Sequence, residues 1–180
     1  MTLIIGLVHK EKVYIGGDSC SSNNIIKTIR KDAKVFRKEE FIIGFTSSWR
    51  MGQLLMSEEF KIEKPKDDDD IFKYMLNIFI PAVIKLFKDN GYAIVENNVV
   101  NGGHFLVGYK NRLFKIQSDF QIEESQDEYN TCGVGEEIAL GVMYALKDKK
   151  LSPTEKILTA LNASQHHNVG VQSPFILLNT

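Results

Sequence analysis

The sequence predicts an α+β fold built from stacked layers, and two observations lead to this. Apolar runs with the composition of β-strands gather at residues 2–46, at residues 105–118 and again at residues 175–178. Two segments with helical apolar spacing follow each of the first two groups. This order is typical of sheets that pack against helices. With 180 residues and 43% hydrophobic content, the chain is expected to form a single domain over residues 1–180.

The first hairpin is predicted close to Met1. Thr2–Val8 and Lys12–Gly17 have the composition of strands, and the charged residues 9–11 join them. Antiparallel pairing would place the start of the first strand, at Thr2, beside the end of the second, at Asp18.

A loop and a second strand pair are predicted next. Ser19–Asn24 is polar and small, so a loop is expected there. Lys34–Phe36 and Phe41–Thr46 form an apolar pair around the charged turn 37–40. In the small-residue turn that follows, Ser47 or Ser48 can cap a helix, and backbone N–H groups could face an oxyanion.

Two helices are predicted between the strand groups. Trp49–Phe60 carries an apolar stripe. The acidic run Asp67–Asp70 precedes a second helix, Ile71–Asp89, where carboxylates complement the positive end of the helix dipole. This helix is apolar on nearly every side and must be covered on more than one face, by a thick core or by a neighbouring subunit. Pro81 should kink it.

Strands return in the second half of the chain. The segment Glu96–Gly103 is rich in turn residues and precedes the strands Phe105–Tyr109 and Leu113–Ser118. Gln121–Asp127 is polar and is expected to be a loop. Asn130–Gly135 is expected to be a turn that leads into the next helix.

Two further helices and one strand complete the predicted elements. Glu136–Lys149 has inward-facing apolar residues. Ser152 as N-cap, Pro153 at the first helical position and Glu155 two residues later form a capping-box signature for the last helix. Phe175–Leu178 is the final predicted strand.

Composition limits the classes of partner and compartment. The net charge is −1, from 22 basic and 23 acidic side chains, so no footprint for nucleic acid is present, and a protein or peptide partner is expected. Cys20 and Cys132 lack zinc-ligand spacing and are expected to be reduced thiols, which favours the cytoplasm. No signal peptide is visible, and Ile71–Phe87 carries lysines and a proline, so no membrane association is expected.

Three parts of the sequence resemble a known family. Thr2, the segment Gly-Gly-Asp18 and the run Lys34–Gly44 are similar to the N-terminal-nucleophile hydrolases, and within them to the proteasome β subunits and the bacterial HslV peptidase. The resemblance extends over almost the whole chain. It implies a four-layer αββα sandwich of two antiparallel sheets between helical layers. It also implies a threonine-type peptidase whose catalytic residues are Thr2, Asp18 and Lys34, once Met1 has been removed.

Elementary chemistry explains why these residue types suit the reaction. A threonine hydroxyl is a poor nucleophile, and the α-amino group of the same residue can activate it as a general base. A free α-amine titrates near roughly 7.7–8.0, so part of it is unprotonated at neutral pH. A lysine cation at Lys34 would lower that pKa further, and a carboxylate at Asp18 would keep the lysine charged and in place. Met1 blocks the amine of Thr2 until it is removed.

The resemblance implies further site residues as well. The backbone N–H of Ser48 stands where the family usually has a glycine that donates to the oxyanion. Ser21, Thr46 and Arg50 would bind the substrate, and Thr46 and Arg50 would line the specificity pocket and favour acidic or polar side chains there. Neither a metal nor a cofactor is implied. The relatives assemble as homo-oligomeric rings and act on peptides or unfolded proteins, in some cases delivered by an ATPase unfoldase.

Two segments depart from the family pattern. The family turn usually reads Gly-Ser-Gly with the serine close to the nucleophile, and Val134 stands at that position here. Valine cannot hydrogen-bond an amine or relay a proton. An aspartate and a serine that support the nucleophile in the family are absent after the last helix, where His166, His167 and Asn168 occur instead. A histidine could shuttle protons there, and exposed residues at a helix end are the alternative.

Three functions therefore stay open at the level of sequence. The first is a threonine peptidase that forms acyl-enzymes on peptide bonds. The second is a catalytically inactive structural subunit of a proteasome-like ring, which the departures at Val134 and after the last helix favour. The third is an amidase of the same class that acts on a small substrate.

Overall fold

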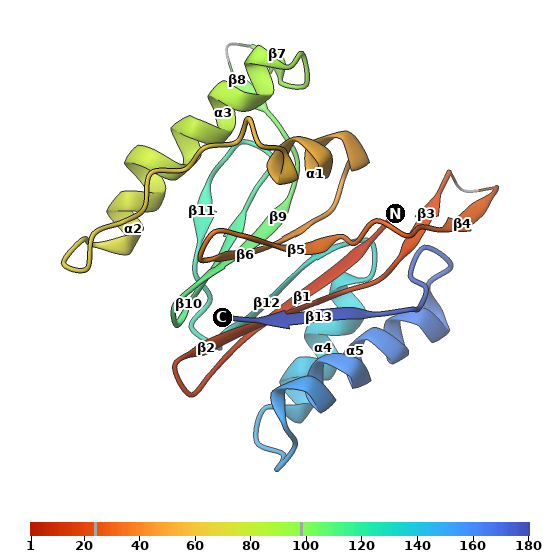
Figure 1. Cartoon of the computed structure of the whole chain (residues 1–180). Coiled ribbons are helices and arrows are strands. Elements are labelled where there is room, and N and C mark those ends of the chain that lie inside the picture. Colours follow the sequence, from red (N-terminus) through yellow and green to blue (C-terminus); the bar gives the residue numbers. More distant parts are fainter. Residues whose placement is uncertain (24, 98) are drawn as a thin grey trace.

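Two antiparallel sheets lie face to face between two helical layers (Figure 1). This computed structural model describes residues 1–23, 25–97 and 99–180. One sheet has the strand order β12-β1-β2-β13 and the other β11-β10-β9-β6-β5. The predicted four-layer αββα sandwich is confirmed. The elements in chain order are β1 (Leu3–His9), β2 (Lys12–Gly17), β3 (Cys20–Ser22), β4 (Lys27–Ile29), β5 (Val35–Lys38), β6 (Phe41–Phe45), α1 (Trp49–Met56), α2 (Ile71–Tyr74), the π-helical η1 (Met75–Phe79), α3 (Ile80–Asp89), β7 (Ile94–Glu96), β8 (Val99–Asn101), β9 (Phe105–Tyr109), β10 (Arg112–Ile116), β11 (Ile122–Glu123), β12 (Tyr129–Gly133), α4 (Glu136–Leu146), α5 (Pro153–His167) and β13 (Ile176–Asn179).

Three apolar clusters hold these layers together. The cluster between the two sheets contains Ile4 and Leu106, both fully buried. A second cluster packs α4 and α5 onto the four-stranded sheet and includes Leu161. A third packs α1, η1 and α3 onto the five-stranded sheet around aromatic side chains such as Phe79. Burial of this apolar surface is the main favourable contribution to folding. The packed layers also hold the start of β1 in a fixed position at one end of the sandwich.

The predicted hairpins and helix caps are present where the sequence placed them. β1 pairs with β2 and β5 with β6. The Ser152 hydroxyl accepts from the backbone N–H of Glu155, and the Glu155 carboxylate accepts from the backbone N–H of Ser152, which confirms the capping box of α5. Ser48 caps α1 and Asp70 caps α2 through their side-chain oxygens.

Three helices differ from their predicted extents, and the smallest difference is in α4, which ends at Leu146 rather than at Lys149. α1 ends at Met56 rather than at Phe60, because both the N–H and the hydroxyl of Ser57 donate to the carbonyl of Leu54 and close the last turn. The long apolar helix is divided into α2, η1 and α3. The N–H of Ile80 reaches back to the Met75 carbonyl, and this wider π-turn directly precedes Pro81, which has no N–H to donate. The π-helical turn thus lies directly before Pro81, and the kink expected there stays a prediction.

Coverage of that helix is incomplete. Met75 and Phe79 are fully buried against the five-stranded sheet. Leu76 keeps 52% of its surface exposed, and Phe72 and Ile78 are exposed as well. The isolated chain therefore leaves an apolar strip on η1 and the adjoining turn of α2.

The predictions of loops and turns were wrong in four places. Ser19–Asn24, predicted as a loop, contains β3, which pairs with β4 in the register Ser21↔Thr28; Asn24 lies outside the described residues. Glu96–Gly103 contains the end of β7 and all of β8, and residue 98 is also outside the described part of the chain. Gln121–Asp127 contains the two residues of β11.

The fourth error concerns the strand that supports the candidate site. Asn130–Gly135, predicted as a turn, is mostly β12, which pairs with β1 from Leu3↔Gly133 to Leu7↔Tyr129. Polar residues such as Thr131 give this strand no β-type pattern, yet Thr131 is fully buried under α4. The pairing between segments so distant in the sequence overrides the local signal.

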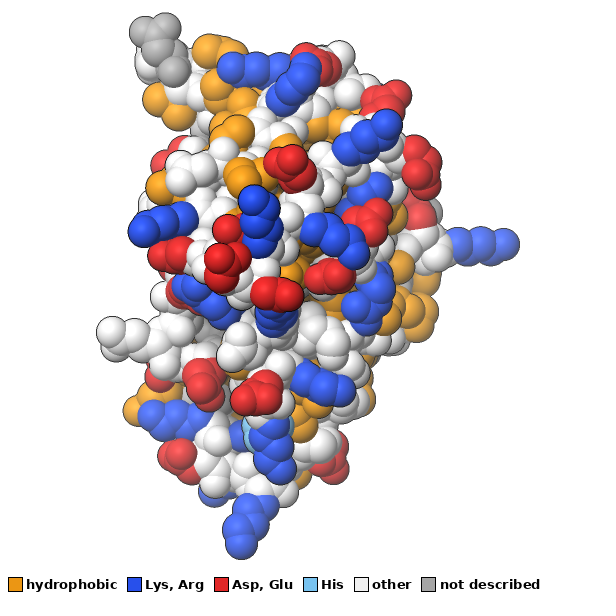
Figure 2. All heavy atoms as spheres, turned by 60° about the vertical axis from the view of Figure 1, so that its left-hand side comes forward, with side chains coloured by type: hydrophobic (Ala, Val, Ile, Leu, Met, Phe, Trp, Pro, Cys, Tyr) orange, Lys and Arg blue, Asp and Glu red, His pale blue; other side chains and the backbone are white. Residues whose placement is uncertain are grey.

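Charges are mixed over the visible surface. Figure 2 shows Lys and Arg side chains interspersed with Asp and Glu on one face of the molecule, without a large area of one sign. Cys20 and Cys132 are buried free thiols. None of the described helices has both the length and the apolar character required to cross a bilayer.

Candidate active site

Thr2 lies at the start of β1, where strand pairing fixes its backbone. Its carbonyl accepts a hydrogen bond of 2.8 Å from the N–H of Val134. Gly133 has a φ of +109°, and a Cβ there would lie 2.1 Å from the Thr2 carbonyl oxygen, so only glycine fits this approach. The Thr2 residue is 7% exposed, and its hydroxyl donates to the Met1 carbonyl at 2.6 Å.

Asp18, at the end of β2, accepts four hydrogen bonds on its two carboxylate oxygens. Oδ1 accepts from the Leu3 N–H at 2.9 Å and from Lys34 Nζ at 2.9 Å. Oδ2 accepts from the Cys20 N–H at 2.8 Å and from the Gln172 N–H at 3.3 Å. The carboxylate therefore joins β1, β3, the residue before β5 and the segment before β13, and Asp18 is 1% exposed.

Lys34, just before β5, directs its ammonium group at the same point. Nζ donates to Asp18 Oδ1, to the Cys20 carbonyl and, at 3.3 Å, to the Met1 carbonyl. Its side chain is 1% exposed. Burial lowers the pKa of the Lys34 ammonium below its ordinary value, while the Asp18 carboxylate opposes that shift. A buried cation thus stands beside the peptide group that joins residues 1 and 2.

One asparagine connects the two loops around this cluster. Asn168 Nδ2 donates to the Val134 carbonyl at 2.9 Å, and Asn168 Oδ1 accepts from the Gly170 N–H at 2.8 Å. The Val134 turn holds the Thr2 carbonyl, and the segment after Asn168 supplies the Gln172 N–H to Asp18. Sequence reasoning placed Asn168 near the site but found no role for it. A polar side chain at a helix end, next to two glycine-containing turns, was the available signal.

Ser48 and its neighbours form the turn predicted to bind an oxyanion. The Ser48 N–H donates to the Thr46 carbonyl at 2.7 Å, and the residue between them, Ser47, has a positive φ of 64°. The Ser48 hydroxyl accepts from the Arg50 N–H at 3.1 Å. The N–H predicted to face an oxyanion is therefore engaged by a carbonyl within its own turn.

The three residues predicted to bind substrate have different surroundings. Thr46 is 4% exposed, and its hydroxyl donates to the His104 carbonyl. The Ser21 hydroxyl accepts from the indole N–H of Trp49 at 3.0 Å. Arg50 is exposed on α1. Arg50 therefore has a side chain free to meet a ligand, whereas the hydroxyls of Ser21 and Thr46 already have protein partners.

His166 and His167 end α5, and both are exposed. Their rings contact each other edge to face, with centroids 4.6 Å apart. Across the described residues, no group of three or more histidine, cysteine, aspartate or glutamate side chains is arranged to hold a metal ion.

The cluster has a definite chemical capacity. A buried lysine cation lowers the pKa of an amine placed beside it and stabilises negative charge that develops nearby. The Asp18 carboxylate compensates the cation and fixes its position through three backbone donors. Freed of Met1, residue 2 would present its hydroxyl and its α-amine to this cation together.

Comparison with known proteins finds solved structures that share this fold. No family model matches the sequence, and no relative was found among curated proteins. BPH from Thiobacillus denitrificans, solved in complex with epoxomicin, superimposes with a TM-score of 0.83 over 99% of this chain and 98% of that one, at 15% sequence identity. HslV from Trypanosoma brucei gives a TM-score of 0.73 at 17% identity, with 99% and 98% covered. Anbu from Yersinia bercovieri gives 0.70 at 11% identity, with 99% and 81% covered. At these identities the likeness is one of fold.

Proposed function

We propose that the protein is a threonine-type peptidase of the N-terminal-nucleophile class, with Thr2 as nucleophile after removal of Met1. The observation that carries the proposal is the buried Lys34 ammonium, held by Asp18 and placed 3.3 Å from the carbonyl that precedes Thr2. A buried ion pair is costly to maintain, and its position beside the first residue of β1 has a simple explanation if that residue performs chemistry.

The proposed reaction begins at the Thr2 hydroxyl. The α-amine, whose pKa is lowered by Lys34, takes the proton from Oγ1 as this oxygen bonds to the carbonyl carbon of the substrate. The tetrahedral intermediate collapses, the C–N bond breaks, and the α-ammonium gives its proton to the departing amine. Water then attacks the resulting ester, the amine accepts the water proton, and Oγ1 leaves as a hydroxyl. No redox partner or cofactor is needed for this sequence.

Stabilisation of the oxyanion is assigned to the turn before α1. The Ser48 N–H is the proposed donor, and its present bond to the Thr46 carbonyl must open for it to act. The flanking residue Ser47 has a positive φ, a conformation that is costly for serine.

The comparisons support the proposal without extending beyond fold. BPH shares the fold and was solved with epoxomicin, which makes that compound a suitable probe for this chain. HslV shares the fold over almost its whole length. We infer peptide or unfolded-protein substrates, a homo-oligomeric ring, a cytoplasmic location and delivery by an ATPase unfoldase as properties to be tested. The exposed apolar strip on η1 supports self-association.

The test combines intact mass with labelling. Protein produced in cells should lack the mass of Met1, because aminopeptidases remove methionine before a small residue. Epoxomicin should then add its mass to this protein, and Thr2→Ala should abolish both labelling and cleavage of fluorogenic peptides. Thr28→Ala, an exposed threonine on β4, is the matched control and should retain both. Fully retained Met1 in native protein, or labelling that survives Thr2→Ala, would refute the nucleophile assignment.

A second function has one specific observation in its favour. Val134 places an aliphatic side chain, 43% exposed, at the turn beside Thr2, and offers no hydroxyl to the amine. The missing hydroxyl at position 134 suits a ring subunit that has lost its catalytic activity. Val134→Ser separates the two readings, since it should raise activity if the machinery is only weakened. If neither wild type nor Val134→Ser shows activity when Met1 is absent, the structural role is favoured.

A further inference from the structure

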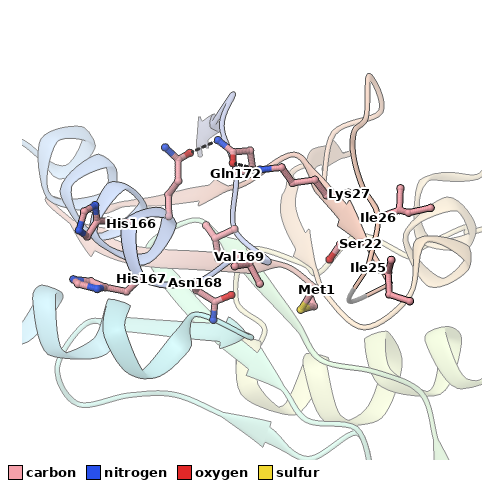
Figure 3. A pocket seen from close by; sticks show the side chains of 12 residues that line it. Met1, Ser22, Ile25, Ile26, Lys27, His166, His167, Asn168, Val169 and Gln172 are labelled. Carbon is pink, nitrogen blue, oxygen red and sulfur yellow. Dashed lines mark hydrogen bonds between the residues drawn. The ribbon is translucent and has the colours of Figure 1, made fainter.

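The described surface has a cavity of about 520 Å³ directly beside Met1. It lies between the turn that joins β3 to β4 and the segment that joins α5 to β13 (Figure 3). In this view Val169 stands close to Met1, with Ile25 and Ile26 across the opening and His166 and His167 at its other end. The mechanism proposed above uses none of these side chains.

The Met1 side chain shows how closely an apolar group fits the inner end of this cavity. A Cβ added to Gly170 would lie 2.6 Å from Met1 Cβ and 2.8 Å from Met1 Sδ. Val134 Cγ1 is 3.1 Å from the same point. The absence of a side chain at position 170 therefore creates the space that a thioether chain fills. Removal of Met1 would leave this space open next to the Thr2 amine and hydroxyl.

Part of the rim of the cavity is apolar and unusually exposed. Ile25 is 90% exposed, Ile26 65% and Val169 80%. Three such side chains around one opening leave apolar surface in water, which an apolar ligand would cover. Ile25 and Ile26 lie far from Val169 in the sequence, so packing within one element does not account for the grouping of all three.

The charges of the lining oppose a cationic ligand. Lys27 lines the cavity and donates to Gln172 Oε1 at 3.0 Å, and the described lining residues include no carboxylate. On the wall near Met1, the Ser22 hydroxyl is buried and has no hydrogen-bond partner among the described residues. A buried polar atom without a partner is costly, and a polar group on a bound ligand would satisfy it.

From these observations we propose that the cavity is a subsite for one apolar, unbranched side chain of the substrate, of the size of methionine, next to the scissile bond. Gly170 sets the depth of the subsite, Val169 and the two isoleucines cover the side chain, and Ser22 meets a backbone group of the bound peptide. This inference rests on the proposed peptidase function, and it adds the class of side chain that the site selects. It differs from the preference for acidic or polar side chains expected at Thr46 and Arg50.

The first experiment measures binding without catalysis. Thr2→Ala protein that has lost Met1 is titrated into fluorescein-labelled Ala-Ala-X-Ala-Ala peptides, in which X is methionine, glycine or lysine, and binding is followed by anisotropy. The methionine peptide should bind at least about tenfold more tightly than the other two, as expected for an apolar pocket that is filled or left empty. Equal affinities for the three peptides, or no measurable binding of the methionine peptide, would overturn the subsite.

Two glycine variants test the place of binding. Gly170→Ala fits the backbone, since the described glycines with positive φ are Gly91 and Gly133, and its methyl group would lie 2.6 Å from the position of Met1 Cβ and so narrow the subsite. It should remove the preference for methionine while affinity for the glycine peptide changes by less than about twofold. Gly141→Ala, on α4 with no neighbour within 4 Å of its Cβ, is the matched control and should keep the preference. A preference unaltered by Gly170→Ala would overturn the assignment.

The second experiment separates this inference from the proposed function. Quenched versions of the same peptides are offered to mature wild-type protein, together with epoxomicin. A binding preference without cleavage or labelling would support the subsite and refute the peptidase. Cleavage at rates that do not depend on X would support the peptidase and overturn the subsite.

Discussion

Replacement of Asp18 by asparagine should destabilise the protein far more than a single lost ion pair at the surface would. The Asp18 carboxylate accepts from four donors, two on each oxygen, and three of these are backbone N–H groups that cannot move away. Asparagine has one oxygen acceptor and presents an NH2 group in place of the other. In either orientation of the amide, its NH2 group replaces one carboxylate oxygen. The two donors bonded to that oxygen lose their acceptor and face the NH2 group, which is itself a donor.

The magnitude follows from this count. Each buried donor without an acceptor costs roughly 1–3 kcal/mol, so two of them should lower the free energy of unfolding by roughly 2–6 kcal/mol. The total stability of a domain is commonly about 5–15 kcal/mol, so Asp18→Asn should remove a large share of it. The buried Lys34 ammonium also loses its counter-charge, which places the expected value toward the upper end.

Urea unfolding followed by the fluorescence of Trp49 measures this loss. Asp32→Asn is the matched control, because Asp32 forms a two-pronged ion pair with Arg30 while each side chain is about one-third exposed. The control should cost at most about 1 kcal/mol. Equal midpoints for the two variants would show that the four-donor arrangement around Asp18 does not act as described.

Three further outcomes are expected. Since burial lowers the pKa of Lys34 below its ordinary value of 10.5, the unfolded chain binds this proton more tightly, and the contribution of Lys34 to the free energy of unfolding should rise with pH between the lowered pKa and 10.5. In urea titrations at several pH values, the unfolding free energy of wild type minus that of Lys34→Met should therefore increase with pH, and a constant difference would contradict the burial. Asn168→Ala should lower the unfolding free energy by about 1–2 kcal/mol by freeing the Val134 turn, with Asn168→Asp, which keeps the acceptor, in between. Sedimentation should find an oligomer that Leu76→Glu weakens, and a wild-type monomer at micromolar concentration would refute the role of the apolar strip.

The sequence predicted the layers because its strong signals are local. The hairpin of β1 and β2 shows in two apolar runs and a charged turn, and the capping box announces α5. β12 could not be predicted in the same way. Its residues Asn130 and Thr131 are polar, and they are held in a strand by pairing with β1 and by contacts to α4 and to Glu123. Long-range pairing of this kind leaves no period in the local sequence.

The candidate site likewise has parts that could be predicted from the sequence and parts that could not. Thr2, Asp18 and Lys34 could be predicted because their spacing resembles that of the N-terminal-nucleophile hydrolases, and each stands at the start or end of a predicted strand. The backbone donors of Cys20 and Gln172 could not, since any residue type supplies an N–H. The catalytic roles of these side chains stay predictions until the labelling experiment is done.

The four hydrogen bonds of the Asp18 carboxylate also determine at which stage of synthesis and folding the site can form. Gln172 lies 154 positions after Asp18, and the intervening β12 must already be paired with β1 for the Thr2 carbonyl to be held. Contacts over such separations form late in folding, after most of the chain is available. A nascent chain still emerging from the ribosome therefore lacks the assembled lysine, carboxylate and threonine, and we expect no labelling by epoxomicin until residue 172 has left the exit tunnel. Under the proposed function, neighbouring nascent chains would be spared until these late contacts have formed.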